Sequence, residues 1–241
     1  MKPDITAIIN LHMEGYLCQP TIKSARRAVQ AAEQSGIRVE VLIVADKADR
    51  RTLHAARSAL QENWRCLEVS LGDLGAARNF GARHANGDLL AFLDGDDLWS
   101  DDWLVASARA SRESSRRVVW HPQINLIFGA QPYIFRNADM DDEGFDLLDM
   151  AYVNPWTALV SAKRDIFLEI PYPETNLNDG IGYEDWGWSL RTIERGIVHK
   201  VIPGTGHAIR RKRGAASLLE RTNAMGVVPS PTRAFRQLLG K

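Results

Sequence analysis

The sequence has few of the residues that could form a disulfide framework or a zinc site. Its 241 residues include only two cysteines, Cys18 and Cys66, and neither stands in a CxxC or a Cys/His cluster. Both kinds of site need such spacings, so the sequence predicts two free thiols in a reducing compartment.

A net charge and a long apolar run are also absent. Lys and Arg together number 30, as do Asp and Glu, so no overall field attracts nucleic acid or an anionic membrane surface. No stretch reaches the roughly 20 apolar residues that cross a bilayer, and the N-terminus lacks the pattern of a signal peptide. We expect a cytoplasmic protein with no nucleic-acid partner and no transmembrane segment. A peripheral contact at the inner face of the membrane stays open.

The first half of the chain alternates short apolar runs with amphipathic stretches. Strands are expected at residues 5–11, 39–45, 66–70 and 88–93, and helices at residues 21–35, 50–62 and 74–85. This alternation is typical of a parallel sheet covered by helices. With 45% apolar residues, the chain is long enough for one large α/β domain with a full core.

The second half has a mixed pattern. Strands are expected at residues 118–120, 125–128, 157–161 and 198–202, and helices at residues 101–114, 184–195 and 232–239. The acidic stretch 136–149 is weakly periodic, which indicates a loop with a short helical turn. The residues after Gly206 are basic.

An acidic run, Asp94-Gly95-Asp96-Asp97, directly follows the fourth apolar strand. It therefore lies beyond the carboxyl edge of a parallel sheet, where open α/β folds bind ligands. Carboxylates in that place suit a hard ion such as Mg²⁺ or Mn²⁺, and Gly95 would let the backbone turn tightly between them. The alternative is that Asp96 and Asp97 cap the next helix, because Asp is a good N-cap.

The residues around this run resemble the signature of the family 2 glycosyltransferases of the GT-A fold. The similar segments are Gly75-Ala76-Ala77-Arg78-Asn79-Phe80-Gly81-Ala82, Ala85-Asn86-Gly87-Asp88, Phe92 to Asp97, Gly182-Tyr183-Glu184-Asp185-Trp186-Gly187-Trp188, and His207 with the following Arg210-Arg211-Lys212. The loops Asn10 to Glu14 and Asp46 to Asp49 depart from the commoner forms, which contain proline and serine.

The resemblance implies an α/β GT-A fold, which is a Rossmann-like, mixed and mainly parallel sheet flanked by helices. It divides the chain into a catalytic domain, residues 1–206, and a basic C-terminal segment, residues 207–241, that closes over the active site. Within the domain, residues 1–97 form the nucleotide-binding half and residues 98–206 the acceptor-binding half.

The implied activity is inverting, metal-dependent transfer of a sugar from a nucleotide-diphosphate donor, with a UDP-sugar favoured. The acceptor would be a hydroxyl of a glycan, a polysaccharide or a lipid-linked glycan, and the ion would be Mn²⁺ or Mg²⁺. Three alternatives stay open. They are a retaining transferase on the same fold, a nucleotidyltransferase, and a non-catalytic module that binds nucleotide sugars.

The resemblance also assigns residues to the metal and the donor. Asp96 binds the metal and His207 supplies a further ligand, while Asp97 is undecided between the metal and a helix cap. Asp94 contacts the ribose or the first sugar of the donor. Asp46 contacts the base or ribose, unless it is an ordinary turn residue.

Cationic residues are the candidates for the donor diphosphate. Arg78 pairs with a phosphate or with the acidic run, or it is a purely structural ion-pair partner. Arg210 and Lys212 fold over the diphosphate or touch an anionic lipid-linked acceptor, unless this basic run is only a solvated face.

The acceptor side is expected at the start of the helix at residues 184–195. An inverting transfer needs a base for the acceptor hydroxyl, and we assign that role to Asp185. Glu184 contacts an acceptor hydroxyl, and Trp186 packs on the apolar face of the sugar. The competing explanations are a helix start that favours carboxylates and ordinary core packing of the tryptophan.

Overall fold

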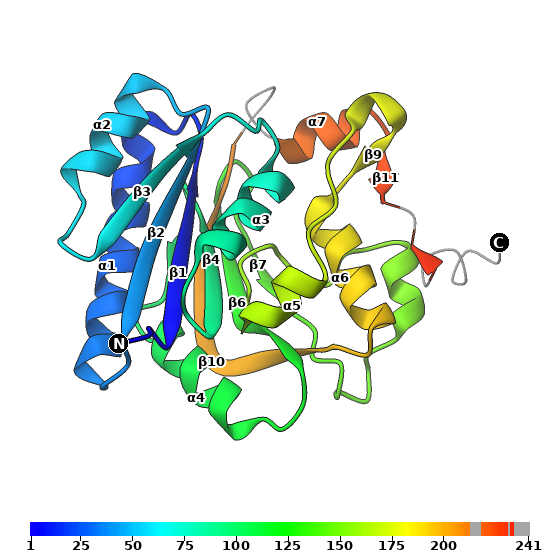
Figure 1. The fold of residues 1–241 in the computed structure, drawn as a ribbon. Helices are drawn as coiled ribbons and strands as arrows, with labels where there is room; N and C mark the ends of the chain where they lie inside the picture. Colours follow the sequence, from blue (N-terminus) through cyan, green and yellow to red (C-terminus); the bar gives the residue numbers. More distant parts are fainter. Residues whose placement is uncertain (213–217, 231, 234–241) are drawn as a thin grey trace.

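A nine-stranded sheet runs through the part of the chain that the structure, a computed structural model, describes: residues 1–212, 218–230 and 232–233 (Figure 1). The strand order is β3-β2-β1-β4-β8-β6-β10-β5, and β7 pairs with β6 at the side of this path. Helices cover both faces of the sheet. The predicted fold class, a mixed α/β sheet flanked by helices, is confirmed.

The first half of the chain forms the parallel part of the sheet. Its strands are β1 (Ile5–Leu11), β2 (Val39–Asp46), β3 (Trp64–Val69) and β4 (Leu89–Asp94). Every residue of β1 is buried, because this strand lies between two others and has helices on both faces. These strands were predicted to within two residues at either end.

Two groups of helices pack on the two faces of the sheet. On one face lie α1 (Cys18–Gln34), α2 (Arg50–Ser58) and α4 (Trp103–Glu113), and on the other lie α3 (Leu74–His84), α5 (Arg164–Glu169) and α6 (Glu184–Glu194). Helix α2 ends four residues before its predicted end. The next residues form a turn that brings Trp64, only 7% exposed, into the core as the first residue of β3.

The second half adds antiparallel and parallel strands to the same sheet. They are β5 (Leu98–Trp99), β6 (Val118–Gly129), β7 (Tyr133–Arg136), β8 (Ser161–Lys163) and β10 (Val198–Arg211). The two strands expected at 118–120 and 125–128 are one strand. Pro122 is tolerated there because it pairs with Ile202, where the register with β10 shifts and a ladder hydrogen bond is not required.

Several second-half elements differ from prediction. Strand β8 begins where the expected strand 157–161 was to end, and β10 continues to Arg211, so residues 207–211 belong to the sheet. The sequence did not predict α5, β7, or the small elements β9 (Ile181–Gly182), α7 (Leu218–Ala224) and β11 (Val228–Pro229).

Of the expected acidic loop and terminal helix, the structure describes the loop and only the start of the helix. Residues 137–146 form neither helix nor strand, and a 3-10 turn, η2 (Leu147–Ala151), follows them. The helix expected at 232–239 lies outside the described residues, except for its first two positions. Within the described ranges, no helix combines the length and the apolar character needed to cross a bilayer.

Candidate active site

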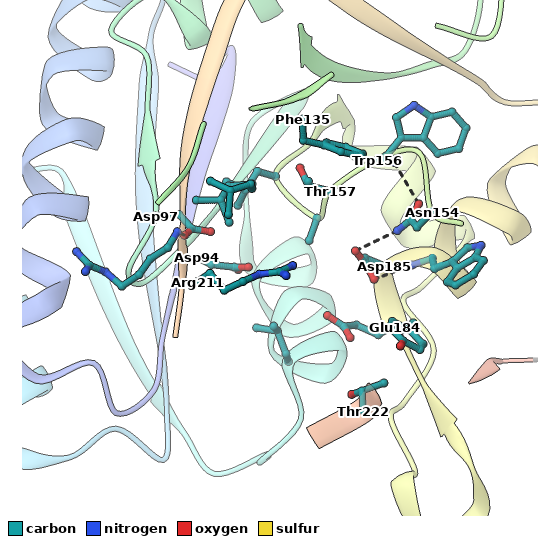
Figure 2. Close-up of a pocket in the computed structure, with 18 of the residues that line it drawn as sticks. Asp94, Asp97, Phe135, Asn154, Trp156, Thr157, Glu184, Asp185, Arg211 and Thr222 are labelled. Carbon is teal, nitrogen blue, oxygen red and sulfur yellow. Dashed lines mark hydrogen bonds between the residues drawn. The ribbon is translucent and has the colours of Figure 1, made fainter. Parts of the chain in front are cut away.

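A cavity of about 560 Å³ opens where β4 ends, between the acidic run and the start of α6 (Figure 2). Sheets of this kind bind ligands at the carboxyl ends of their parallel strands, and this volume suits a small-molecule substrate. The cavity wall contains most of the predicted site residues, namely Arg78, Asp94, Asp96, Glu184, Asp185, Trp186, Arg210 and Lys212. Asp46 and His207 lie outside it.

The acidic run ends β4 in a tight turn, in which the Asp97 N–H donates to the Asp94 carbonyl at 3.1 Å. Gly95 is not in the left-handed region, so the turn does not depend on its conformational freedom. Glycine is required here because there is no room for a side chain. A Cβ at this position would lie 2.9 Å from the Asn10 carbonyl oxygen and from the Glu14 carboxyl carbon. The run therefore packs directly against the loop that follows β1.

Asp96 and Asp97 do not cap a helix, because β5 follows the run and α4 begins only at Trp103. Asp97 Oδ1 accepts the backbone N–H of Arg210 at 2.7 Å. Burial, followed by the charges of Asp94 and Asp96, raises the pKa of Asp97 well above its ordinary value. The helix-capping alternative is therefore excluded, and the run is a buried carboxylate cluster that a cation would stabilise.

A lysine ammonium lies beside these carboxylates. Lys212 Nζ is 3.0 Å from Asp96 Oδ2, and Lys212 is the residue after the end of β10. Asp96 is 8% exposed, and burial raises its pKa while Lys212 opposes that rise. Lys212 is thus the cation that Asp96 contacts in this structure.

Arg78 is fully buried on α3 and joins the two sides of the cavity. Its Nη2 donates to both Asp94 oxygens at 3.0 and 2.9 Å, and its Nη1 donates to Glu184 Oε1 at 2.7 Å. Burial alone would lower the pKa of the guanidinium, but the two carboxylates raise it above its ordinary value. Arg78 therefore serves as a structural ion-pair partner here, and a contact with a donor phosphate stays a prediction.

Asp185 is the next residue after Glu184 but has no cation bound to it. Its Oδ1 accepts the N–H of Trp186 at 2.8 Å, and its Oδ2 accepts Asn154 Nδ2 at 3.3 Å (Figure 2). Burial, followed by the charge of Glu184, raises the pKa of Asp185 to about 7, and Arg78 opposes this only in part. A carboxylate that titrates near neutral pH can exchange protons with a substrate.

The backbone just before these two acids is strained. Tyr183 has φ 53° and ψ 61°, in the left-handed region that residues other than glycine rarely enter. Such strain costs on the order of 1–3 kcal/mol and occurs mostly at functional sites. Here it sets the start of α6 so that Glu184 and Asp185 both line the cavity, close to the positive end of the helix dipole.

One wall of the cavity consists of residues that the sequence did not single out. They come from β7 and from the segment between η2 and β8, and most are aromatic or polar: Tyr133, Phe135, Tyr152, Asn154, Trp156 and Thr157. The Trp156 ring stacks on the buried His199 ring at 4.2 Å, which fixes its orientation. The run Asn154-Pro155-Trp156-Thr157 is the one sequence signal that could have identified this wall, since it combines polar and aromatic side chains around a proline.

Asp46 ends β2 and contacts backbone groups. Its two oxygens accept N–H groups from Leu71 at 2.6 Å and from Gly72 at 2.8 Å, and its carbonyl oxygen lies 2.6 Å from His12 Nδ1. The turn-residue role, one of its two alternatives, accounts for these contacts. A contact with the base or ribose of a donor stays a prediction.

His207 lies in the core. It is 3% exposed, and its ring packs edge-on against Trp103 with 4.6 Å between ring centres. Burial lowers its pKa to about 3, so the ring is neutral, and neither ring nitrogen has a hydrogen-bond partner. Its role as a metal ligand stays a prediction.

The donor set at the acidic run fits a divalent ion only in part. Among the described residues, no three His, Cys, Asp or Glu side chains form a ready metal-binding group. Mg²⁺-type sites that act on nucleotides need only one or two carboxylates, because substrate phosphates complete the coordination. Asp96 and Asp97 offer such oxygens, and the Lys212 ammonium 3.0 Å from Asp96 Oδ2 shows that a cation can lie beside them. The residues present therefore fit an ion that arrives with a phosphorylated donor.

Known proteins share both sequence and fold with this chain. Residues 7–123 match the family model described as glycosyl transferase family 2. The chain is 36% identical over 105 residues to the amylovoran biosynthesis glycosyltransferase AmsB of Erwinia amylovora, and the match covers 39% of this chain and 35% of AmsB. The chain thus spans about a third of the length of this curated relative.

Solved structures extend the likeness to the whole chain. The mannosyltransferase PcManGT from Pyrobaculum calidifontis, in complex with GDP-Man and Mn²⁺, has a TM-score of 0.66 at 16% identity, covering 100% of this chain and 69% of PcManGT. S. aureus TarS 1–349 in complex with UDP has a TM-score of 0.62 at 14% identity, covering 88% of this chain and 61% of that one. At such identities the likeness shows the fold. Together with the family match, it confirms the predicted resemblance.

Proposed function

We propose that this chain acts as a family 2 glycosyltransferase of the GT-A fold, which moves a sugar with inversion from a nucleotide-diphosphate donor to a hydroxyl of a glycan, polysaccharide or glycolipid. One observation carries the proposal: Asp185 and the acidic run line the same cavity from two sides (Figure 2). Inverting transfer needs a base on the acceptor side and positive charge at the leaving diphosphate on the other side.

Asp185 is the general base of this proposal. Its carboxylate takes the proton of the acceptor hydroxyl while the hydroxyl oxygen bonds to the anomeric carbon of the donor sugar. The bond between that carbon and the diphosphate oxygen breaks, and the nucleoside diphosphate leaves with the electron pair. A pKa of about 7 supports this role, since a base works best when its pKa lies near the operating pH. Glu184 and Trp186, in the same wall, contact the acceptor.

Asp96, with Asp97 beside it, would hold Mn²⁺ or Mg²⁺. When bound, the ion neutralises charge on the leaving diphosphate. Asp94 contacts the ribose or sugar of the donor, and Arg210 and Lys212 contact the diphosphate. Arg210, Lys212 and Thr222 all line the cavity, which supports a donor site to which the end of β10 and helix α7 both contribute.

The neighbours indicate which donors to test first. PcManGT was solved with GDP-Man and Mn²⁺, and TarS with UDP. A thermal-shift screen of UDP-, GDP-, dTDP- and CMP-sugars, with and without Mn²⁺, would identify the donor because a ligand of the folded state raises its apparent stability. We propose a UDP-sugar.

The metal assignment is tested with Asp96→Ala. We expect the variant to lose Mn²⁺-dependent release of nucleoside diphosphate. Asp101→Ala is the matched control, since Asp101 is an exposed carboxylate paired with Arg27 at 2.8 Å outside the cavity, and it should keep full turnover. Undiminished turnover in Asp96→Ala would rule out this ion site.

Inversion itself is read from the product. NMR of the transferred sugar should show the anomeric configuration opposite to that of the donor. Retained configuration would contradict Asp185 as a base on the face opposite the diphosphate.

A further inference from the structure

The acidic run is neutralised from within the chain. The Lys212 ammonium lies 3.0 Å from Asp96 Oδ2, and Glu14 and Asp97 are the other carboxylates that act on it. Lys212 is therefore a cation in contact with one acidic side chain and close to two others.

This ion pair differs from the other lysine pairs of the described chain. The Asp96 side chain is only 11% exposed, whereas the carboxylate partner of Lys200, Asp141, is 41% exposed. A buried carboxylate loses much of its hydration and depends on a nearby cation, while an exposed one does not. Removing Lys212 from Asp96 without a replacement would therefore leave this buried carboxylate without the cation that contacts it.

A divalent ion and this ammonium compete for Asp96. An ion of the Mg²⁺ type binds a carboxylate oxygen at about 2.0–2.1 Å, so an ammonium that stayed 3.0 Å from Asp96 Oδ2 would be repelled by the ion at short range. The lysine side chain is long, with a flexible four-carbon stem. Lys212 is 31% exposed and lines the same cavity as the acidic run, so it can turn away from Asp96 without leaving the site.

We propose that Lys212 and the divalent ion exchange at Asp96: the ammonium occupies the ion's place in the metal-free chain, and the arriving ion releases it toward the diphosphate of the donor. The inference rests on the proposed function. It adds that one side chain neutralises the empty site and then supplies a second positive charge to the leaving group. In the metal-free chain, the ammonium that later contacts the donor would thus stay bound to the Asp96 carboxylate.

The exchange predicts that Lys212 weakens metal binding. The apparent Kd for the metal is the intrinsic Kd divided by the fraction of molecules in which the site is open. If Lys212 closes the site in nine molecules of ten, the metal therefore binds about tenfold more weakly. We expect Lys212→Met to bind Mn²⁺ about tenfold or more tightly than the unmodified chain in the absence of any nucleotide. Free Mn²⁺ measured by electron paramagnetic resonance gives this affinity directly.

Lys200→Met is the matched control. Lys200 also pairs with a carboxylate, Asp141 at 2.7 Å, and is 29% exposed against 31% for Lys212, but it does not line the cavity. Its substitution removes the same charge and should leave Mn²⁺ affinity unchanged. Equal affinity of the unmodified chain and Lys212→Met would overturn the exchange. Absence of Mn²⁺ binding by all three proteins without nucleotide would overturn the exchange. Mn²⁺ binding that then appeared only with a nucleoside diphosphate would leave the ion site of the proposed function standing, because donor phosphates complete such a site.

A second measurement separates exchange from a distant charge effect. Acetylation of lysines, followed by mass spectrometry, reports how accessible each amine is. Mn²⁺ without nucleotide should raise the labelling rate of Lys212 severalfold and leave that of Lys200 unchanged. A Lys212 rate that does not respond to saturating Mn²⁺ would show that the ammonium stays at Asp96, and the proposal would be wrong.

Discussion

The end of strand β4 and the start of helix α6 bring carboxylates to the same cavity, but only some of them have a cation as partner. Asp94 and Glu184 both bind the guanidinium of Arg78, which is buried on α3 and holds them at 2.7 to 3.0 Å. Asp185, one residue after Glu184 on α6, receives only the Trp186 N–H and the Asn154 amide. The same residue class is thus a cation-bound acid in one place and an acid without a bound cation in the other.

The difference shows that a cation, more than burial alone, decides the role of a carboxylate here. Glu184 is 7% exposed, yet its charge is balanced by Arg78. Asp185 has no such partner, and burial raises its pKa to about 7. Chemistry is therefore expected from the unpaired acid, and stability from the paired ones.

The largest effect should separate the two neighbouring acids. Asp185→Asn keeps the shape of the side chain but removes the base, so we expect a fall in kcat of about 10²–10⁴-fold, the range that general-base catalysis contributes. Glu184→Gln keeps an oxygen for Arg78 and should lower kcat less than about tenfold. Initial rates at saturating donor and acceptor measure both. A similar loss in the two variants would erase the distinction between the paired and the unpaired acid.

The pH dependence sharpens this result. The value of kcat/KM should rise with pH and level off above about pH 7, because Asp185 must lose its proton to act as a base. Its folded-state pKa is raised from an ordinary value of 3.8, so the folded chain keeps a proton that the unfolded chain loses between pH 4 and 7, and stability falls across that range. Asp185→Asn removes this loss. We therefore expect the free energy of unfolding in urea to be equal for Asp185→Asn and the unmodified chain near pH 4. Above that pH the variant should become the more stable of the two, by a margin that grows up to about pH 7 and then stays constant.

The second largest effect concerns the paired acids. Arg78→Met leaves Asp94 and Glu184 without their cation, and breaking a buried ion pair on one side typically costs about 3–5 kcal/mol of unfolding free energy. Arg27→Met is the control, since its pair with Asp101 has side chains 49% and 58% exposed and should contribute at most about 1 kcal/mol. Urea unfolding monitored by tryptophan fluorescence measures both. Equal losses would mean that Arg78 is not the structural centre of the cavity.

The sequence predicted the parts of this comparison that depend on local pattern. Strand β4 and the acidic run were found because a continuous apolar run before several carboxylates is distinctive, and Glu184 and Asp185 because they open a periodic helix. The role of Arg78 could not be decided, because a phosphate and two carboxylates attract the same guanidinium. Only the fold shows that residues 106 positions apart, Arg78 and Glu184, are in contact.

Other parts depend on long-range packing alone. His207 was assigned to a metal on the strength of the resemblance, yet the length of β10 places its ring against Trp103 in the core. Asn154, which bonds to the predicted base, and Tyr152 come from a segment with little periodicity, so no local signal connected them with Asp185. The strain at Tyr183 is likewise invisible in the sequence, since a tyrosine in the left-handed region is set by its surroundings.

The smallest effect tests whether the acceptor site beside Asp185 reaches the exposed edge of the cavity. Tyr152 lines the cavity on the Asp185 side and is 85% exposed, so its ring can cover the apolar face of an acceptor sugar but contributes little to the fold. Most contacts at the edge of a binding surface contribute less than about 1 kcal/mol, so Tyr152→Ala should raise the acceptor KM by about two- to fivefold and leave kcat and unfolding unchanged. Tyr16→Ala is the control, because Tyr16 is 56% exposed and does not line the cavity. An unchanged acceptor KM in Tyr152→Ala would limit the acceptor site to the inner wall formed by Trp156 and Trp186.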